Sequence, residues 1–247
     1  MNGVMICEGS TDYSLLQYYM REVYLWEDDT KKQNNVLKNP GQKSRLLTKG
    51  QDTLTIMSAG GCSRLIEGLH NALSRNKLSG AEMSDAFNKI VIVTDRDEVG
   101  TESDFIKRVQ DELDCFNVSV SGEMVNNCWF KCEMLTSIGI KSEFVMLLLI
   151  IPFEDNGAME TFLLKAIAAD DEYDKNIIQE CEKLVDNVDP QRKYLTARRI
   201  VTKAKFDTYF SIRTPAEQFV ERQNILKSVK WEEYSSIQND FKLLAEL

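Results

Sequence analysis

Four stretches of the chain carry apolar residues at successive positions instead of alternate ones, at 4–7, 54–57, 90–93 and 144–151. Strands that are buried on both faces of a sheet show this pattern. The first three are each followed by apolar residues at helical spacing. Strand and helix therefore alternate along the chain, which predicts an α/β fold whose mainly parallel sheet is covered by helices.

Two further segments complete the predicted organisation. Residues 128–134 alternate apolar with polar positions, the pattern of a half-buried strand that is antiparallel or lies at an edge. Beyond Pro152 the periodicity is helical, with helices expected near 177–188, 191–206, 214–230 and 233–245. Because no Gly/Ser linker intervenes, we expect an α/β domain over residues 1–168 and a helical extension over 169–247 packed on it.

Composition places the chain among globular proteins and makes a nucleic-acid coat protein improbable. Its formal net charge of −9 gives no overall positive field for a polyanion. Positive charge is local: the segments 31–50 and 191–205 each hold six Lys or Arg residues and no acidic residue. Such segments are more often solvated surface than phosphate-binding tracks.

Cysteine spacing and the length of the apolar runs give no sign of a zinc site, of secretion or of a membrane span. The six cysteines lack the paired C-x-x-C spacing of a zinc site, and no secretory signal is evident. The run 144–151 is far shorter than the roughly 20 residues that cross a bilayer. We therefore expect a cytoplasmic protein that has no membrane partner.

Carboxylates follow two of the predicted strands. Glu8 comes directly after the first strand and Asp12 falls in the first turn of the next helix, while Asp95 and Asp97 follow the third strand. Ligands of open parallel sheets bind at these carboxyl ends. In extended chain Asp95 and Asp97 point to one side, about 7 Å apart, which suits Mg²⁺. The alternative is that such residues only start turns and helices. For Asp12, the favourable interaction of a carboxylate with the N-terminal end of the helix dipole would be a sufficient explanation.

A fifth carboxylate follows the last apolar run. In "IIPFEDNGAMETFLL", Glu160 lies near the start of a predicted helix. A lone glutamate in this position is most often solvated. If the preceding strand lies beside the others, Glu160 approaches the same edge of the sheet.

The order of three motifs resembles the Toprim domain: "EGSTD", then "SAGGCSRL", then "IVIVTDRDEVG". Topoisomerases, bacterial primases, recombination mediators and a ribonuclease that matures 5S rRNA share this domain. The later "IIPFEDNGAMETFLL" looks more like stand-alone Toprim-like proteins of unassigned function and like the overcoming-lysogenization-defect (OLD) nucleases. The resemblance covers residues 2–168, and its motifs are weak singly but fairly specific in this order.

The resemblance implies roles for the five carboxylates. Glu8 matches the glutamate that acts as general acid or base on the attacking or leaving oxygen, and that also serves as a metal ligand. Asp95 and Asp97 match the D-x-D metal ligands, and Asp12 and Glu160 match carboxylates that complete a second metal site. The implied cofactor is one or two Mg²⁺ or Mn²⁺ ions, and the implied substrate is a DNA or RNA phosphodiester.

The basic segments and the second motif supply candidates for holding a nucleic acid: Lys43, Arg45, Lys49, Ser63, Arg64, Arg198 and Arg199. Several family features are missing. The chain has no identifiable topoisomerase tyrosine, no primase zinc module and no P-loop. A separate ATPase or other protein partner and a homodimer therefore stay open.

Three functions are compatible with these patterns. The first is a metal-dependent nuclease, and the second is a non-catalytic Toprim-like module that binds nucleic acid or protein. The third, a small-molecule phosphohydrolase, ranks last because haloacid-dehalogenase-like enzymes carry the D-x-D pair after their first strand, not their third. Serine or cysteine hydrolase chemistry is not expected, because the only histidine, His70, lies in mid-helix.

Overall fold

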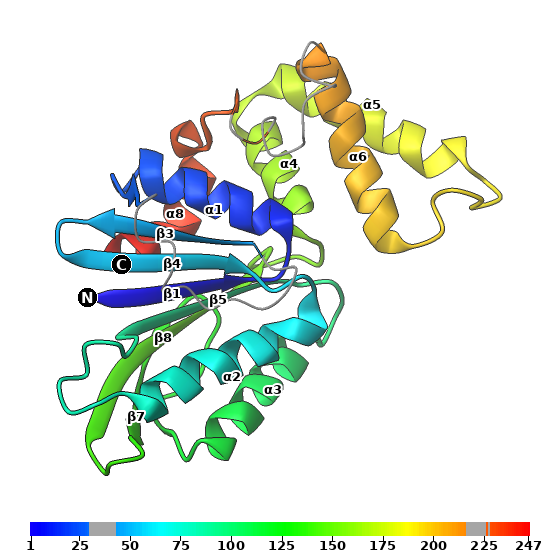
Figure 1. Ribbon diagram of the computed structural model, residues 1–247. Coiled ribbons are helices and arrows are strands. Elements are labelled where there is room, and N and C mark those ends of the chain that lie inside the picture. Colours follow the sequence, from blue (N-terminus) through cyan, green and yellow to red (C-terminus); the bar gives the residue numbers. More distant parts are fainter. Residues whose placement is uncertain (30–42, 216–225, 227) are drawn as a thin grey trace.

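The computed structural model describes residues 1–29, 43–215, 226 and 228–247 (Figure 1). Most of the predicted helix 214–230 and residues 31–42 of the first basic segment lie outside this part of the chain. The strands are β1 (Asn2–Cys7), β2 (Glu27–Asp28), β3 (Ser44–Lys49), β4 (Asp52–Ser58), β5 (Lys89–Asp95), β6 (Ser119–Ser121), β7 (Trp129–Leu135) and β8 (Lys141–Ile151). The helices are α1 (Ser10–Glu22), α2 (Cys62–Leu78), α3 (Thr101–Cys115), α4 (Met159–Asp170), α5 (Glu172–Val188), α6 (Arg198–Arg213) and α8 (Ser235–Asp240), with short 3-10 turns at Trp231–Glu233 and Lys242–Glu246.

The described strands form one mixed sheet in the order β2-β3-β4-β1-β5-β8-β7-β6. The four strands predicted to be parallel, β4, β1, β5 and β8, are parallel neighbours, which confirms that prediction. Antiparallel strands extend the sheet on both sides. Strand β7 is antiparallel as expected, but it is not at the edge because β6 pairs with it. Cys128 precedes the strand and is exposed, so the alternating pattern begins one residue later.

Helices cover both faces of the sheet, which explains the continuous apolar runs. Figure 1 shows α1, α4 and α8 on one face, and α2 and α3 on the other. Along β1, Met5 and Cys7 belong to the core under α1, whereas Val4 and Ile6 belong to the core under α2. Successive side chains of a strand point to opposite faces. A strand between two helical layers therefore needs apolar residues at every position.

The C-terminal helices pack on the α1 face. Phe206, Trp231 and Phe241 are fully buried in the same apolar cluster as residues of α1 and α4. The boundary at residue 168 stays a prediction. Among the described helices, none has the length and apolar content needed to cross a membrane.

Two sequence predictions need correction. The segment 44–49, interpreted as part of a basic surface loop or helix face, forms β3 because it pairs antiparallel with β4. The helix expected from residue 191 begins only at Arg198. The carboxylate of Asp189 accepts hydrogen bonds from the backbone N–H groups of Lys193, Tyr194 and Leu195, and these bonds hold the chain in a loop.

The strand order creates a crevice at the centre of the sheet. From β1 the chain passes through α1 on one face and then to β3 and β4 on one side, whereas from β5 it passes through α3 on the other face to the β7–β8 side. The loops that follow the adjacent strands β1 and β5 therefore diverge. In open α/β sheets such a switch point is where ligands bind.

Candidate functional site

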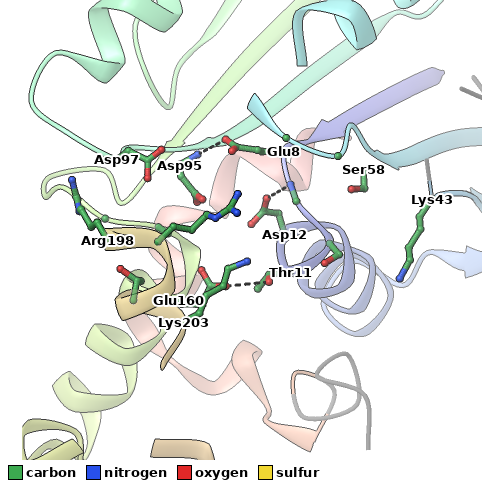
Figure 2. Close-up of a pocket in the computed structure, with 18 residues that line it drawn as sticks. Glu8, Thr11, Asp12, Lys43, Ser58, Asp95, Asp97, Glu160, Arg198 and Lys203 are labelled. Atoms are coloured by element: carbon green, nitrogen blue, oxygen red, sulfur yellow. Dashed lines mark hydrogen bonds between the residues drawn. The ribbon is translucent and has the colours of Figure 1, made fainter. Parts of the chain in front are cut away.

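A cavity of about 330 Å³ opens at the carboxyl ends of β1, β4 and β5, at the switch point (Figure 2). It is lined by all five of the carboxylates singled out in the sequence: Glu8, Asp12, Asp95, Asp97 and Glu160. Segments of β1, α1, β5 and α4 that are far apart in the sequence bring them together. The cavity is also lined by basic side chains of α6.

Glu8 occupies the first position after β1. Its Oε2 accepts a hydrogen bond of 2.6 Å from the hydroxyl group of Thr94 and a longer one of 3.4 Å from the backbone N–H of Asp95. Its backbone carbonyl accepts hydrogen bonds from the N–H groups of Gly60 and Gly61, at 3.1 and 2.9 Å. Both glycines have positive φ, 84° and 128°, which other residues rarely adopt. The glycine pair thus fixes the loop beside Glu8.

Asp12 lies in the first turn of α1 and is only 4% exposed. Its Oδ2 accepts a hydrogen bond of 2.8 Å from the backbone N–H of Gly9. The pKa of Asp12 is raised to about 7, mainly by burial and in addition by the carboxylates of Glu160 and Glu8, while the Gly9 N–H and the ammonium group of Lys203 act in the opposite direction. A helix-start role alone does not account for a carboxyl group buried beside two others.

Asp95 and Asp97 differ in their environments. Asp95 ends β5, and its Oδ1 accepts a hydrogen bond of 3.0 Å from the backbone N–H of Met159, which joins β5 to α4. Burial raises the pKa of Asp95 well above its usual range, and the carboxylates of Asp12 and Glu8 act in the same direction. Asp97 lines the same cavity from an exposed position in the following loop.

Glu160 lies in the first turn of α4 and is 3% exposed, so it is not the solvated glutamate of the alternative interpretation. Its Oε1 accepts a hydrogen bond of 3.2 Å from the hydroxyl group of Thr11. This bond links α4 to α1 across the cavity. A buried carboxyl group in contact with another element is held in a defined position, as a ligand must be.

The side chains at this cavity suit a Mg²⁺ ion that is bound only partly by the protein. Among the described residues, no three His, Cys, Asp or Glu side chains are grouped as a ready-made ligand set. A closed protein cage therefore does not fit. Mg²⁺, however, usually keeps several waters and takes one or two carboxylates together with phosphate oxygens. The carboxylates at this cavity offer oxygen atoms for such an ion, and its positive charge would offset the repulsion between them.

Three of the seven candidate nucleic-acid residues line the cavity: Lys43, Arg198 and Arg199. Arg198 also forms an ion pair with Glu98, with 4.0 Å between Nη1 and Oε1. Arg199, the next residue of α6, also lines the cavity. These side chains place positive charge beside the carboxylates.

The other four candidates lie outside the cavity lining. Lys49 pairs with Asp52 at the start of β4, so it lies at the opposite end of the sheet from the cavity, and its role in nucleic-acid binding stays a prediction. Arg45 forms an ion pair with Asp28 at 3.2 Å. Ser63 and Arg64 are exposed in the first turn of α2, just beyond the glycine pair.

Sequence reasoning missed several polar residues of the site, among them Lys203, Thr11 and Thr94. Lys203 follows Arg199 by four residues, so helical spacing places both on one face of α6 and was a usable signal. Thr11 and Thr94 gave no such signal. Their roles depend on hydrogen bonds to Glu160 and Glu8 that only the folded chain shows.

The chain belongs to a family described as "Protein of unknown function (DUF3226)", whose sequence model matches residues 2–244. Among curated proteins, none matches the chain significantly. A hypothetical protein from Pyrococcus horikoshii OT3, PH0156, is similar over 99% of this chain and 98% of its own, with a TM-score of 0.51 and 17% identity. At this identity the similarity concerns the fold alone.

Two other solved structures are similar at much lower scores. Lactoylglutathione lyase from Agrobacterium tumefaciens has 12% identity and a TM-score of 0.17, over 59% of this chain and 92% of its own. The fosfomycin resistance protein FosX from Listeria monocytogenes has 9% identity and a TM-score of 0.18, over 63% and 93%. Scores this low do not indicate a shared fold.

Proposed function

We propose that this protein is a Toprim-like, Mg²⁺-dependent phosphoryl-transfer enzyme that cleaves DNA or RNA phosphodiesters. The observation that supports it best is the convergence of five carboxylates on one cavity at the sheet switch point. The Toprim resemblance of the motifs that carry Glu8, Asp95 and Asp97 supports the same assignment. Basic side chains of α6 at the cavity suit a phosphate-containing substrate.

The residues divide into metal-holding and proton-handling groups. Asp95 and Asp97 would hold one ion, and Asp12 and Glu160 would contribute to a second. When bound, Mg²⁺ or Mn²⁺ neutralises phosphate charge and stabilises the attacking and leaving oxygens. Glu8 would hold or release a proton at one of these oxygens.

The surroundings of Glu8 suit this role. The hydroxyl group of Thr94 and the N–H of Asp95 both donate to Oε2, so the carboxylate has a fixed orientation. Arg198 and Arg199 would hold the phosphate, because guanidinium groups form paired hydrogen bonds with its oxygens.

The experiment is a plasmid-nicking and RNA-cleavage assay with Mg²⁺ or Mn²⁺. The wild-type protein should cleave at least one substrate, and Glu8→Gln should lower the rate about 10²- to 10⁴-fold, as expected for loss of a general acid or base. Asp95→Asn should also lose activity. Asp111→Asn, at an exposed position of α3, is the matched control and should cleave normally. Lack of cleavage by the wild type, or full activity in both site variants, would overturn the proposal.

A second candidate is a non-catalytic Toprim-like module that binds nucleic acid or protein. It is favoured by the lack of a ready-made three-residue metal set among the residues that the structure describes. Titration calorimetry separates the two functions. Mg²⁺ binding by the wild type that is lost in Asp95→Asn supports the enzyme, whereas no Mg²⁺ binding supports the module.

A further inference from the structure

The loop between α5 and α6 carries an exposed aromatic ring four residues before Arg198, which lines the cavity. In Figure 1 these two helices project away from the sheet, and the loop runs from the far end of α5 back to the start of α6, which lies toward the sheet edge. Tyr194 lies in this loop with 71% of its surface exposed. Four residues later Arg198 begins α6 and lines the cavity. The tyrosine is thus close along the chain to the proposed phosphate-holding residues.

The loop holds this ring on a defined backbone. The carboxylate of Asp189 accepts hydrogen bonds from the N–H groups of Lys193, Tyr194 and Leu195, at 3.0, 2.7 and 2.8 Å. Arg192 donates its N–H to the carbonyl of Asp189 at 2.9 Å and has a positive φ of 51°. Rigid loops that present side chains to solvent are common in binding sites.

Positive charge surrounds the ring. The ammonium group of Lys193 lies 4.9 Å from the ring centroid of Tyr194, and Arg192 is exposed beside it. Together with Arg198 and Arg199, which line the cavity, these residues form a basic segment of the chain on both sides of the ring, called the basic track below. Proteins that bind single-stranded nucleic acids combine such basic tracks with aromatic rings on which bases stack.

We propose that Tyr194 is a base-stacking residue for single-stranded DNA or RNA that enters the cavity along Arg198 and Arg199. The inference rests on the proposed function and narrows its substrate to unpaired strands. Bases of a duplex already stack on each other, so the ring of Tyr194 offers them little. The charges of the track would attract both forms, but only a single strand gains from the aromatic ring.

A second tyrosine provides a matched control. Tyr173, in the first turn of α5, is 75% exposed. Its neighbours in the sequence are Glu172 and Asp174 instead of basic residues. A helix of this length spans about 25 Å, so Tyr173 lies far from Tyr194 at the other end of α5.

The experiment measures fluorescence anisotropy of the full-length protein with labelled single-stranded DNA and RNA of about 12 nucleotides, a typical site size, and with the matching duplexes. EDTA is present throughout, so that no cleavage occurs. Tyr194→Ala should weaken single-strand binding about tenfold, within the range measured for stacked aromatic residues. Tyr194→Trp should bind at least as tightly as the wild type, and Tyr173→Ala should bind equally well.

Salt dependence separates stacking from charge. Arg198→Gln should reduce the slope of log affinity against log salt, because one phosphate contact is lost. Tyr194→Ala should leave that slope unchanged while lowering affinity at every salt concentration. This readout distinguishes a stacking ring from a ring that only supports the loop.

Three results would overturn the inference: no binding of single strands by the wild type, unchanged binding in Tyr194→Ala, or equal losses for single strands and duplexes. The cleavage assay separates the inference from the proposed function. Weakened binding in Tyr194→Ala without cleavage by any form supports stacking and overturns the nuclease. Cleavage with unchanged binding in Tyr194→Ala supports the nuclease and overturns stacking.

Discussion

The carboxyl group of Asp12 makes the stability of the metal-free protein depend on pH. Burial raises its pKa to about 7 from an ordinary value of 3.8. Between these values the folded state binds a proton that the unfolded state has released, so the free energy of unfolding falls as pH rises. A difference of about three pH units corresponds to roughly 4 kcal/mol. The pKa of Asp95 is raised as well, so this group acts in the same direction.

The perturbation that tests this is Asp12→Asn. Asparagine keeps an oxygen that accepts the hydrogen bond from the N–H of Gly9, but it carries no charge. In EDTA at pH 8 the variant should be more stable than the wild type by up to about 4 kcal/mol. Near pH 4 the two proteins should have similar stability, because the carboxyl group is then protonated in the folded wild type.

The assay is urea unfolding followed by tryptophan fluorescence, at pH 4 and pH 8 in EDTA. Trp231 is fully buried and reports on the core that α1 shares with the C-terminal helices. Asp97→Asn is the matched control: Asp97 lines the same cavity but is exposed, so its replacement should change stability by less than about 0.5 kcal/mol. If Asp12→Asn is less stable than the wild type at pH 8, the reasoning that the buried negative charge of Asp12 destabilises the folded protein is refuted.

Mg²⁺ should oppose this instability in the wild type. A ligand that binds only the folded state at 100 times its dissociation constant stabilises it by about 2.7 kcal/mol. At pH 8 the gain should be larger in the wild type than in Asp12→Asn, because the variant has lost one anionic ligand. Equal gains would show that Asp12 does not take part in binding the ion.

Two further predictions concern the nucleic-acid residues and the C-terminal core. Lys43→Gln should weaken the binding of labelled single-stranded DNA several-fold, whereas Lys49→Gln should not, because only Lys43 lines the cavity; anisotropy titrations that show equal losses would contradict this placement. Trp231→Ala should lower the free energy of unfolding in urea by about 3–5 kcal/mol, because Trp231 is fully buried. Tyr173→Ala should change it by less than about 0.5 kcal/mol, and similar losses in both variants would show that the burial of Trp231 does not govern stability.

The parallel sheet and its acidic edge could be predicted because both follow from local patterns. Burial on both faces leaves uninterrupted apolar runs, and a run that stops marks the carboxyl end of a strand. Glu8 and Asp95 stand at such ends, so the parallel arrangement alone placed them at the same edge of the sheet, and the pairing of β1 with β5 then brings them together. Glu160 also needed β8 to lie beside β5, which the sequence could only suggest.

The elements that were missed depend on contacts between distant segments. In β3, basic and hydroxyl residues flank only two buried leucines, so the sequence shows no regular alternation of apolar and polar positions. The strand forms because it pairs with the edge of β4. This pairing also separates Lys43 from Lys49 by the length of β3, about 20 Å. The start of α6 was misplaced because the side chain of Asp189 competes with the helix for backbone N–H groups.

The distribution of charge explains why α6 matters for any polyanionic substrate. A chain with a net charge of −9 repels nucleic acid at long range, and the carboxylates at the sheet edge add to this repulsion. Arg198, Arg199 and Lys203 all line the cavity from one helix, so positive charge is concentrated where the phosphate would lie. Under the proposed function the sheet edge supplies the chemistry, and α6 with its preceding loop determines which substrate reaches it.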